Sequence, residues 1–385
     1  MQSFFKKLPR YSLRLLLAYL VYIFTGGVLA YLLPRQARNL PQTDSFYGIG
    51  RGPDRAVLVE EPQDAFARRV EVIRTAQSTL DVCYHCVKSG ETTECFFAEL
   101  LRAADRGVRV RVLLDGTVGG LSGARSNIAL ALRAHPNIEY RIYNPVDLLR
   151  PWEWNALLHD KFILADDRML LLGGRNIGDE YFAPPGYEGA VTYDRDVLVL
   201  NDLAGTPDSS ESVTAQAKIY MDTLWDAPET DKFGTLSPSR RADGLAAQEY
   251  LKETAARWEA AAPSFYLPSE PASQCAVPTQ RVTLLHNPVS PFKKEPTLGA
   301  TLAQLLSGCQ KIRLQTPYGH PHSEALAALT RLAKQGHVEY LTNSMASSPN
   351  YPAFSAYSSQ RAKFLATGVE IYEYQSTDSI HGKSC

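Results

Sequence analysis

One order of elements occurs twice in the chain, and this repeat constrains the fold more than any other feature of the sequence. Each copy has a strand, a helix that ends at a glycine, two further strands, and then a histidine and a lysine separated by one residue. The first copy comprises the segments 79–82, 96–106, 108–114, 138–143 and His159-Asp160-Lys161. The second copy comprises the segments 311–314, 324–334, 337–341, 369–374 and His381-Gly382-Lys383. Strands and helices repeated in this order predict a duplicated α/β domain.

The repeat divides the 385-residue chain into five segments. Two helical patterns lie between the copies, at 211–225 and 245–261, on either side of a stretch rich in proline, serine and arginine. The predicted segments are an apolar N-terminal segment (1–33), a linker (34–54), the first half (55–202), a helical connector (203–280) and the second half (281–385).

Residues 15–33 form a run without a charge, and four cations precede it (Lys6, Lys7, Arg10 and Arg14). As a helix the run would be about 28 Å long, close to the hydrocarbon thickness of a bilayer. A membrane anchor is the favoured interpretation, and a signal peptide cleaved near Ala30 is the alternative. Both interpretations predict a body across the inner membrane, on its periplasmic side, because those four cations outnumber Arg35 and Arg38 after the run.

Composition argues for a globular chain rather than a dedicated nucleic-acid binder. Apolar residues make up 45% of the chain, and 40 basic residues face 41 acidic ones, so no basic excess exists. Nucleic acid is therefore not an expected partner. The sequence Cys83-Tyr84-His85-Cys86 has a metal-like spacing, but it lies on a predicted buried strand, where residues three apart point to opposite faces. No metal site is expected there.

The first histidine motif lies in an apolar segment, 157–164, that precedes a turn at Asp166, so a strand is predicted. Residues two apart on a strand share a face, so His159 and Lys161 project together while Asp160 points away. An imidazole and an ammonium group then reach one phosphate. Asp166 lies five residues past Lys161, on the other face. We expect it to shape the turn and the local charge rather than to contact substrate.

The pattern that starts at His159, His-x-Lys-x4-Asp-x6-Gly-Gly-x-Asn, resembles the HKD signature of the phospholipase D superfamily. The run Gly-Gly-Arg-Asn-Ile-Gly-Asp-Glu-Tyr-Phe at 173–182 most resembles the bacterial cardiolipin synthases, particularly their C-type branch. The similarity extends from about Leu58 to the end of the chain. It implies two αβα-layered halves about a pseudo-twofold axis, with one His-x-Lys from each half at a shared site. It also implies that neither a metal nor an organic cofactor is needed.

The resemblance assigns catalytic roles to the two motifs. His159 is expected to attack phosphorus and form a phosphohistidine, while His381 acts as acid and base; the reverse assignment stays open. Lys161 and Lys383 are expected to neutralise the nonbridging oxygens of the phosphate. Asp166 completes the catalytic signature of the first half.

Further site residues follow the first motif. Asn176 is expected to bind the phosphate as a neutral donor. A nucleophilic imidazole needs an acceptor on its other nitrogen, and Asp194 and Asp196 share a strand face where the family has such a carboxylate. Asp194 is the favoured one of the two. Gly173 and Gly174 are interpreted as a close approach of backbone to the phosphate.

The second motif is cut short, because the chain ends two residues after Lys383. The second aspartate, the second asparagine and every later strand of the repeat are missing. Unpaired strand edges and an uncovered core would cost more than the typical stability of about 5–15 kcal/mol. We therefore expect a C-terminally truncated chain with little or no activity of its own.

Three functions are compatible with these residues. The favoured one is a phosphatidyltransferase that makes cardiolipin from phosphatidylglycerol and a second phospholipid, with phospholipid and membrane as partners. The first alternative is a phospholipase D-type phosphodiesterase or nuclease that uses water as acceptor. The second alternative is an inactive membrane-anchored interaction protein. The apolar N-terminal segment and the balanced charge favour lipid transfer over cleavage of nucleic acid.

Overall fold

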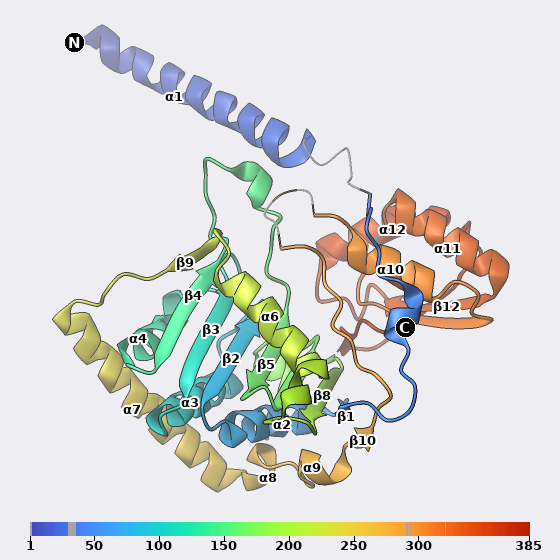
Figure 1. The fold of residues 1–385 in the computed structure, drawn as a ribbon. Helices are drawn as coiled ribbons and strands as arrows, with labels where there is room; N and C mark the ends of the chain where they lie inside the picture. Colours follow the sequence, from blue (N-terminus) through green and yellow to red (C-terminus); the bar gives the residue numbers. More distant parts are fainter. Residues whose placement is uncertain (1, 30–35, 290–291, 293, 320) are drawn as a thin grey trace.

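The chain forms an N-terminal helix, a large α/β half and a smaller α/β half, as seen in a computed structural model (Figure 1). The structure describes residues 2–29, 36–289, 292, 294–319 and 321–385. The junction between the predicted anchor and linker, with the alternative cleavage site at Ala30, lies outside the described residues.

The N-terminal helix, α1, spans Gln2–Ile23 and continues as a π-helical segment, Phe24–Val28. A stretch of it, Tyr11–Val28, has a mean hydropathy of 1.4 and is not buried by the rest of the chain. Length and composition therefore make this helix a candidate membrane span, as the sequence predicts.

The first half is built on one mixed sheet, which has nine strands within the described residues. The order is β10-β1-β8-β6-β5-β2-β3-β4-β9, with β2, β3 and β4 parallel and the other pairs antiparallel. The strands are β1 (Asp54–Val59), β2 (Thr79–Tyr84), β3 (Arg109–Asp115), β4 (Ile138–Tyr143), β5 (Lys161–Ala165), β6 (Met169–Gly173), β8 (Asp196–Asn201), β9 (Thr230–Lys232) and β10 (Val277–Pro278).

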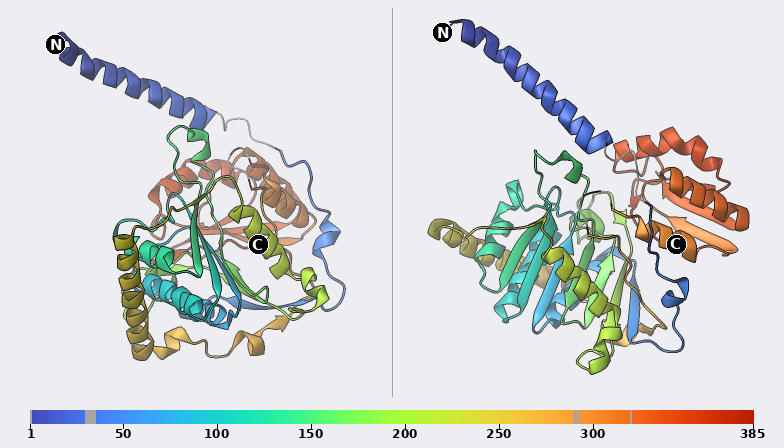
Figure 2. Two further views of the ribbon diagram at one scale, coloured as in Figure 1. Left: turned by 60° about the vertical axis from the view of Figure 1, so that its left-hand side comes forward. Right: turned by 45° about the horizontal axis from the view of Figure 1, so that its top comes forward.

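Helices cover both faces of this sheet (Figure 2). Those that pack on one face are α2 (Pro62–Thr75), α3 (Glu91–Asp105), α4 (Ser126–Ala134), α7 (Pro238–Ala261) and α8 (Pro263–Tyr266). The other face is covered by α6 (Val213–Trp225). Short helices α5 (Asp179–Phe182) and α9 (Ala272–Cys275) complete the half.

Two separate cores result from the alternation of side chains along each strand. On β2, Val82 and Tyr84 are buried beneath α2 and α3, whereas Cys83 is buried against the α6 side. Strand β5 is buried on both faces and is apolar after Lys161, whereas β3 begins with arginines at alternate positions, 109 and 111. The first half is thus an αβα sandwich.

The second half is smaller. Its strands β11 (Lys311–Gln315), β12 (His337–Asn343) and β13 (Glu370–Tyr374) form a parallel sheet in that order. Its helices are α10 (Thr297–Leu305), α11 (Ser323–Gln335) and α12 (Tyr351–Leu365). A third core, around Ile312, Leu332, Tyr340 and Phe364, holds them together.

A short two-stranded ladder joins the halves. Strand β14 (Ser379–Ile380) of the second half pairs in parallel with β7 (Thr192–Tyr193) of the first half. The backbone N–H of His381 donates to the carbonyl of Tyr193 at 2.6 Å. The second histidine motif is therefore attached to the first half through this ladder and to its own sheet through the bridge between Ser384 and Gln315.

The repeat predicted the strands of both copies, but it placed several boundaries incorrectly. Helices α3 and α7 begin at Glu91 and Pro238, earlier than the predicted starts at 96 and 245. Gly107 ends α3 with a φ of 93°, as a left-handed glycine does, whereas Gly336 is extended. The two helices of the predicted connector, α6 and α7, form parts of the two helical layers.

Candidate active site

Three strand ends of the first half meet at one edge of the sheet. Strands β2 and β3 end there with His85 and Asp115, and antiparallel β5 begins there just after His159. The Asp115 carboxylate accepts a hydrogen bond from the backbone N–H of Leu158 at 2.8 Å and from that of Thr117 at 2.9 Å. The segment that enters the first motif is thus fixed by the end of β3.

The first His-x-Lys motif has the predicted geometry. Lys161 Nζ lies 3.3 Å from Nδ1 of His159 and donates to the His159 carbonyl at 2.6 Å. Asp160 points to the opposite side, where the hydroxyl of Tyr220 donates to it at 3.0 Å. The strand itself starts at Lys161, so His159 lies at its entrance. Alternation along the chain still brings the imidazole and the ammonium group together.

The second motif repeats this contact and adds a carboxylate. Lys383 Nζ lies 3.1 Å from the His381 ring and donates to the His381 carbonyl at 2.8 Å. Nδ1 of His381 lies 2.6 Å from Oδ2 of Asp194. Although burial alone would raise it, the pKa of the Asp194 carboxyl is lowered by this hydrogen bond and by the charges of His381 and Lys383. The Asp194 carboxylate is therefore ionised and holds the ring.

The two motifs share one electrostatic site. Burial and the charge of Lys383 lower the pKa of Lys161 to about 8, and burial lowers that of Lys383 to about 8. Burial, Lys161 and His85, followed by Lys383 and His381, lower the pKa of His159 to about 2. Two ammonium groups that repel each other beside neutral imidazoles form a binding site for an anion.

We expected the carboxylate of Asp194 to accept a hydrogen bond from His159, the predicted nucleophile. Asp194 does contact a histidine of the site, but this histidine is His381. No carboxylate lies within 4 Å of His159 in the part of the chain that the structure describes. The reason is the β7–β14 ladder, which brings His381 next to the strand that carries Asp194.

The assignment of Asp196 as a histidine-orienting residue is wrong. Its Oδ2 accepts from Arg69 and Arg175, both at 2.9 Å, and all three side chains are buried.

Gly173 and Gly174 have a role other than bringing the backbone close to a phosphate. A side chain at 173 would collide with the carboxylate of Asp196, and one at 174 with that of Asp194. The two glycines make room for two buried carboxylates.

Asp166 has the turn-shaping role that its position on the strand indicates, and its place among the catalytic residues is wrong. It sits at the far end of β5 from His159, in a hairpin with a positive φ of 49°. Its carboxylate accepts from the backbone N–H of Ser78 at 2.8 Å and of Thr79 at 2.7 Å. Asp166 thus ties the start of β2 to the β5–β6 hairpin.

The predicted phosphate ligand Asn176 is buried behind the histidines. Its Nδ2 donates to the hydroxyl of Tyr181 at 2.9 Å, and its Oδ1 has no hydrogen-bond partner among the described residues. The Tyr181 ring lies edge-on to His381, with centroids 5.8 Å apart. Asn176 therefore contacts the site indirectly in this structure, through the ring of Tyr181 that lies against His381.

Sequence reasoning missed a third histidine, His85. Its ring centroid lies 4.4 Å from that of His159, and its Nδ1 lies 2.8 Å from the carbonyl of Leu158. Burial and the charge of Lys161 lower its pKa. A signal was present, because His85 directly follows a buried strand, but the neighbouring cysteines drew attention to metal binding instead.

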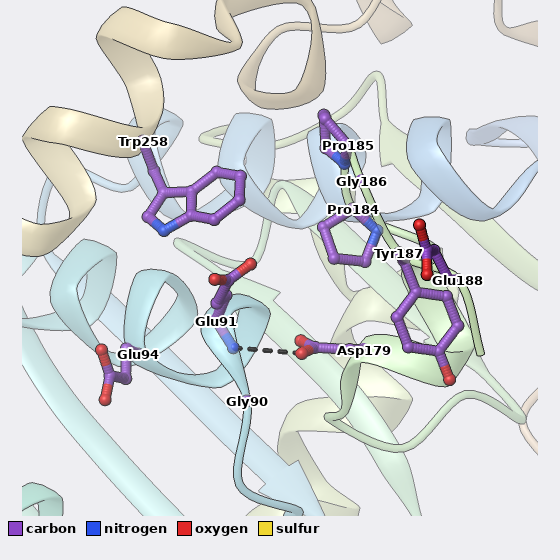
Figure 3. A pocket seen from close by; sticks show the side chains of 10 residues that line it. All are labelled: Gly90, Glu91, Glu94, Asp179, Pro184, Pro185, Gly186, Tyr187, Glu188 and Trp258. Carbon is purple, nitrogen blue, oxygen red and sulfur yellow. Dashed lines mark hydrogen bonds between the residues drawn. The ribbon is translucent and has the colours of Figure 1, made fainter.

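A cavity of about 550 Å³ lies apart from the histidines (Figure 3). Trp258 and Tyr187 flank it, and Asp179 lies at its floor. The Asp179 carboxylate accepts from the backbone N–H of Glu91 at 3.2 Å and of Thr92 at 2.9 Å, so it caps the start of α3. The Asp179 carboxylate therefore has a structural role as the cap of this helix.

Comparisons with known proteins agree with this site. Residues 70–199 match the family described as "Cardiolipin synthase, PLD-like domain". The chain is 29% identical to cardiolipin synthase C of Escherichia coli over 83% of its length and 69% of that protein. It is 23% identical to cardiolipin synthase A of Buchnera aphidicola over 85% of its length and 59% of that protein.

A solved structure shows the same fold. The phosphatidylserine synthase of Haemophilus influenzae superimposes with a TM-score of 0.55 at 14% identity, over 86% of this chain and 75% of that one. The fold, the paired His-x-Lys motifs and these similarities define a phospholipase D-type enzyme. Residues 70–199 match a phospholipase D-like domain, and the chain is similar to the cardiolipin synthases, which supports an enzyme of the phosphatidyltransferase class.

Proposed function

We propose that the protein transfers a phosphatidyl group from phosphatidylglycerol to the hydroxyl group of a second phospholipid, which produces cardiolipin. The observation that carries this proposal is the meeting of two His-x-Lys pairs in one site, with Asp194 on His381. The similarity to two cardiolipin synthases supports the choice of lipid substrates.

The two lysines would bind the phosphodiester. Both have a lowered pKa because they are buried, and Lys161 also because Lys383 lies near. An anionic phosphate relieves this repulsion, so binding it stabilises the protonated form of both lysines. Charge on the nonbridging oxygens persists in the transition state, and the ammonium groups are already in place to offset it.

Transfer would take two in-line steps. A histidine nitrogen attacks phosphorus, the bond from phosphorus to the glycerol oxygen breaks, and the second histidine protonates the departing alkoxide. In the second step that histidine takes the proton from the acceptor hydroxyl, whose oxygen attacks phosphorus while the phosphorus–nitrogen bond breaks. Each step leaves the total charge and the proton count balanced.

The hydrogen bonds favour His381 as the nucleophile, which reverses the assignment that the resemblance suggests. Asp194 accepts a hydrogen bond from Nδ1–H of His381, which puts the ring's lone pair on Nε2, 3.1 Å from Lys383 Nζ, and stabilises the cationic phosphohistidine. His159 would act as the acid in its imidazolium form, which a bound anionic phosphodiester favours, and would donate the Nε2 proton to the leaving group.

Trapping the intermediate tests the mechanism. The full chain is mixed with ³²P-labelled phosphatidylglycerol in vesicles and quenched with alkali, which preserves phosphohistidine. We expect label on His381 and none in His381→Gln, whereas His159→Gln accumulates label because the base that activates the acceptor hydroxyl in the second step is missing. Label on His159 in the wild-type chain would restore the opposite assignment.

Product analysis separates the candidate functions. Cardiolipin with free glycerol supports the proposal, whereas phosphatidic acid as the main product means that water is the acceptor. Cleavage of a DNA substrate at a comparable rate would favour a nuclease. A chain that binds vesicles, forms no phosphohistidine and makes no product would favour an interaction protein.

A further inference from the structure

The loop between β4 and β5, residues 144–158, carries apolar side chains on its outer surface. Val146, Leu148 and Leu149 are 55, 61 and 74% exposed. Burying a leucine side chain stabilises a protein by about 1.5–3 kcal/mol, and these side chains gain none of that from the rest of the chain. An apolar patch of this kind at the tip of one loop marks a contact surface.

The loop is a well-connected structure. Asn144 Nδ2 donates to the carbonyl of Glu153 at 2.8 Å, and Trp154 Nε1 donates to the carbonyl of Asp147 at 2.7 Å. Arg150 pairs with Asp147 at 3.0 Å and with Glu153 at 3.2 Å. Polar groups are thus satisfied within the loop, while the leucines between them point outward.

The candidate membrane span rests on this same loop (Figures 1 and 2). The Tyr19 hydroxyl donates to the carbonyl of Leu148 at 2.9 Å, and the Tyr22 hydroxyl donates to that of Leu149. The Tyr22 ring is 6.2 Å from that of Trp152, edge to face. The tip of the loop therefore lies beside the middle of an apolar helix.

This contact sets the depth of the loop tip relative to the span. Val28 ends the candidate span, and Tyr19 and Tyr22 precede it by nine and six residues. At 1.5 Å per residue, these tyrosines lie about 14 and 9 Å along the helix from that end. If Val28 marks the membrane surface, Leu148 and Leu149 lie within the hydrocarbon layer.

We propose that the β4–β5 loop inserts Leu148 and Leu149 into the leaflet that faces the body, next to α1. The proposal rests on the membrane anchoring assigned to α1. The occupant of the apolar surface is a lipid bilayer. Because the loop ends at Leu158, the residue before His159, insertion places the first motif at the membrane surface. There it meets the phosphodiester groups of the lipids without drawing a lipid into water.

A depth measurement on the full chain tests the insertion. Leu149→Cys is labelled with the fluorophore NBD and reconstituted into phosphatidylcholine–phosphatidylglycerol vesicles that contain a lipid with a nitroxide on its acyl chain. Leu17→Cys on α1 and Leu245→Cys on α7 are labelled in the same way; both leucines are exposed. Each variant carries serine at the four cysteines that are not buried (Cys86, Cys275, Cys309 and Cys385).

We expect the nitroxide to quench the labels at 149 and 17 to a similar extent, several-fold more than the label at 245. Aqueous iodide should show the opposite order. Quenching at 17 without quenching at 149 would overturn the loop insertion alone. Iodide quenching at both positions would overturn the anchor as well. None of these readouts depends on lipid transfer, so a chain without transferase activity can still support the insertion.

Discussion

Oδ2 of Asp194 and Nδ1 of His381 lie 2.6 Å apart, although 187 residues separate them in the chain. The contact unites the two halves, because Asp194 follows β7 and His381 follows β14, and these two strands pair. It also fixes the ring of His381, whose Nε2 lies 3.1 Å from Lys383 Nζ. The orientation of the second histidine therefore depends on the first half of the chain.

Replacing Asp194 by asparagine should reduce kcat by about 10²- to 10⁴-fold, because an amide at this position cannot stabilise a cationic ring. The phosphohistidine signal at His381 should fall in parallel. The NMR titration of His381 provides the specific readout, because losing the carboxylate lowers the pKa of the imidazole further. An unchanged pKa together with unchanged kcat would mean that the contact has no role in positioning.

The two lysines predict how activity depends on pH. Both must be protonated to hold the phosphodiester, and both have a pKa of about 8 in the free protein. The value of kcat/KM should therefore fall as the pH rises through 8, by about tenfold or more per pH unit. Lys383→Arg should make this limb less steep, since a guanidinium stays protonated and only Lys161 then titrates near pH 8. A limb of unchanged steepness would exclude Lys383 as one of its sources.

Asp196 is predicted to contribute to stability rather than to catalysis. Asp196→Asn leaves the buried guanidinium groups of Arg69 and Arg175 without their shared counter-charge, which should cost about 3–5 kcal/mol of unfolding free energy. Denaturant unfolding measures this loss. The control is Glu60→Gln, because Glu60 pairs with Arg195 at the exposed surface and its loss should cost about 0–1 kcal/mol. Equal effects of the two variants would contradict the assignment.

His85 is predicted to act through His159. The charge of His85 is one of the causes that lower the pKa of His159, so His85→Gln should raise that pKa. Because His159 is proposed to act as the acid, the limb on which kcat/KM falls with its deprotonation should shift to higher pH, with KM for phosphatidylglycerol little changed. His135→Gln is the control, since His135 pairs with Asp105 at 3.2 Å, away from the site. The same limb at the same pH in wild type and His85→Gln would exclude this role.

Local pattern was enough to predict most elements. Segments of six or seven residues rich in aliphatic and aromatic side chains correspond to β2, β3 and β4, and the His-x-Lys spacing placed imidazole and ammonium on one side of the chain. These features depend on neighbours within a few positions. The starts of α3 and α7 were missed because their first turns are polar and their apolar contacts come from distant helices.

Hydrogen-bond partners from distant segments of the chain could not be predicted from local sequence patterns. Asp194 and Asp196 are two residues apart and have the same side chain, yet one holds a histidine and the other holds two arginines. Neither Arg69 nor Arg175 stands out in the sequence. His85 was overlooked for the same reason, because its proximity to His159 depends on the antiparallel pairing of β2 with β5.

The sequence by itself determined which side chains can do chemistry, since the residue types and spacing of the two motifs predict a histidine nucleophile with lysines for phosphate. Tertiary structure alone decided which carboxylate serves which histidine, that Asp166 ties its turn to the start of β2, and that a loop with exposed leucines lies against the candidate membrane span. The physical reason is the separation along the chain between the residues that interact. Spacing along a strand controls which neighbours share a face, whereas hydrogen bonds between segments far apart in the chain exist only after the strands have paired.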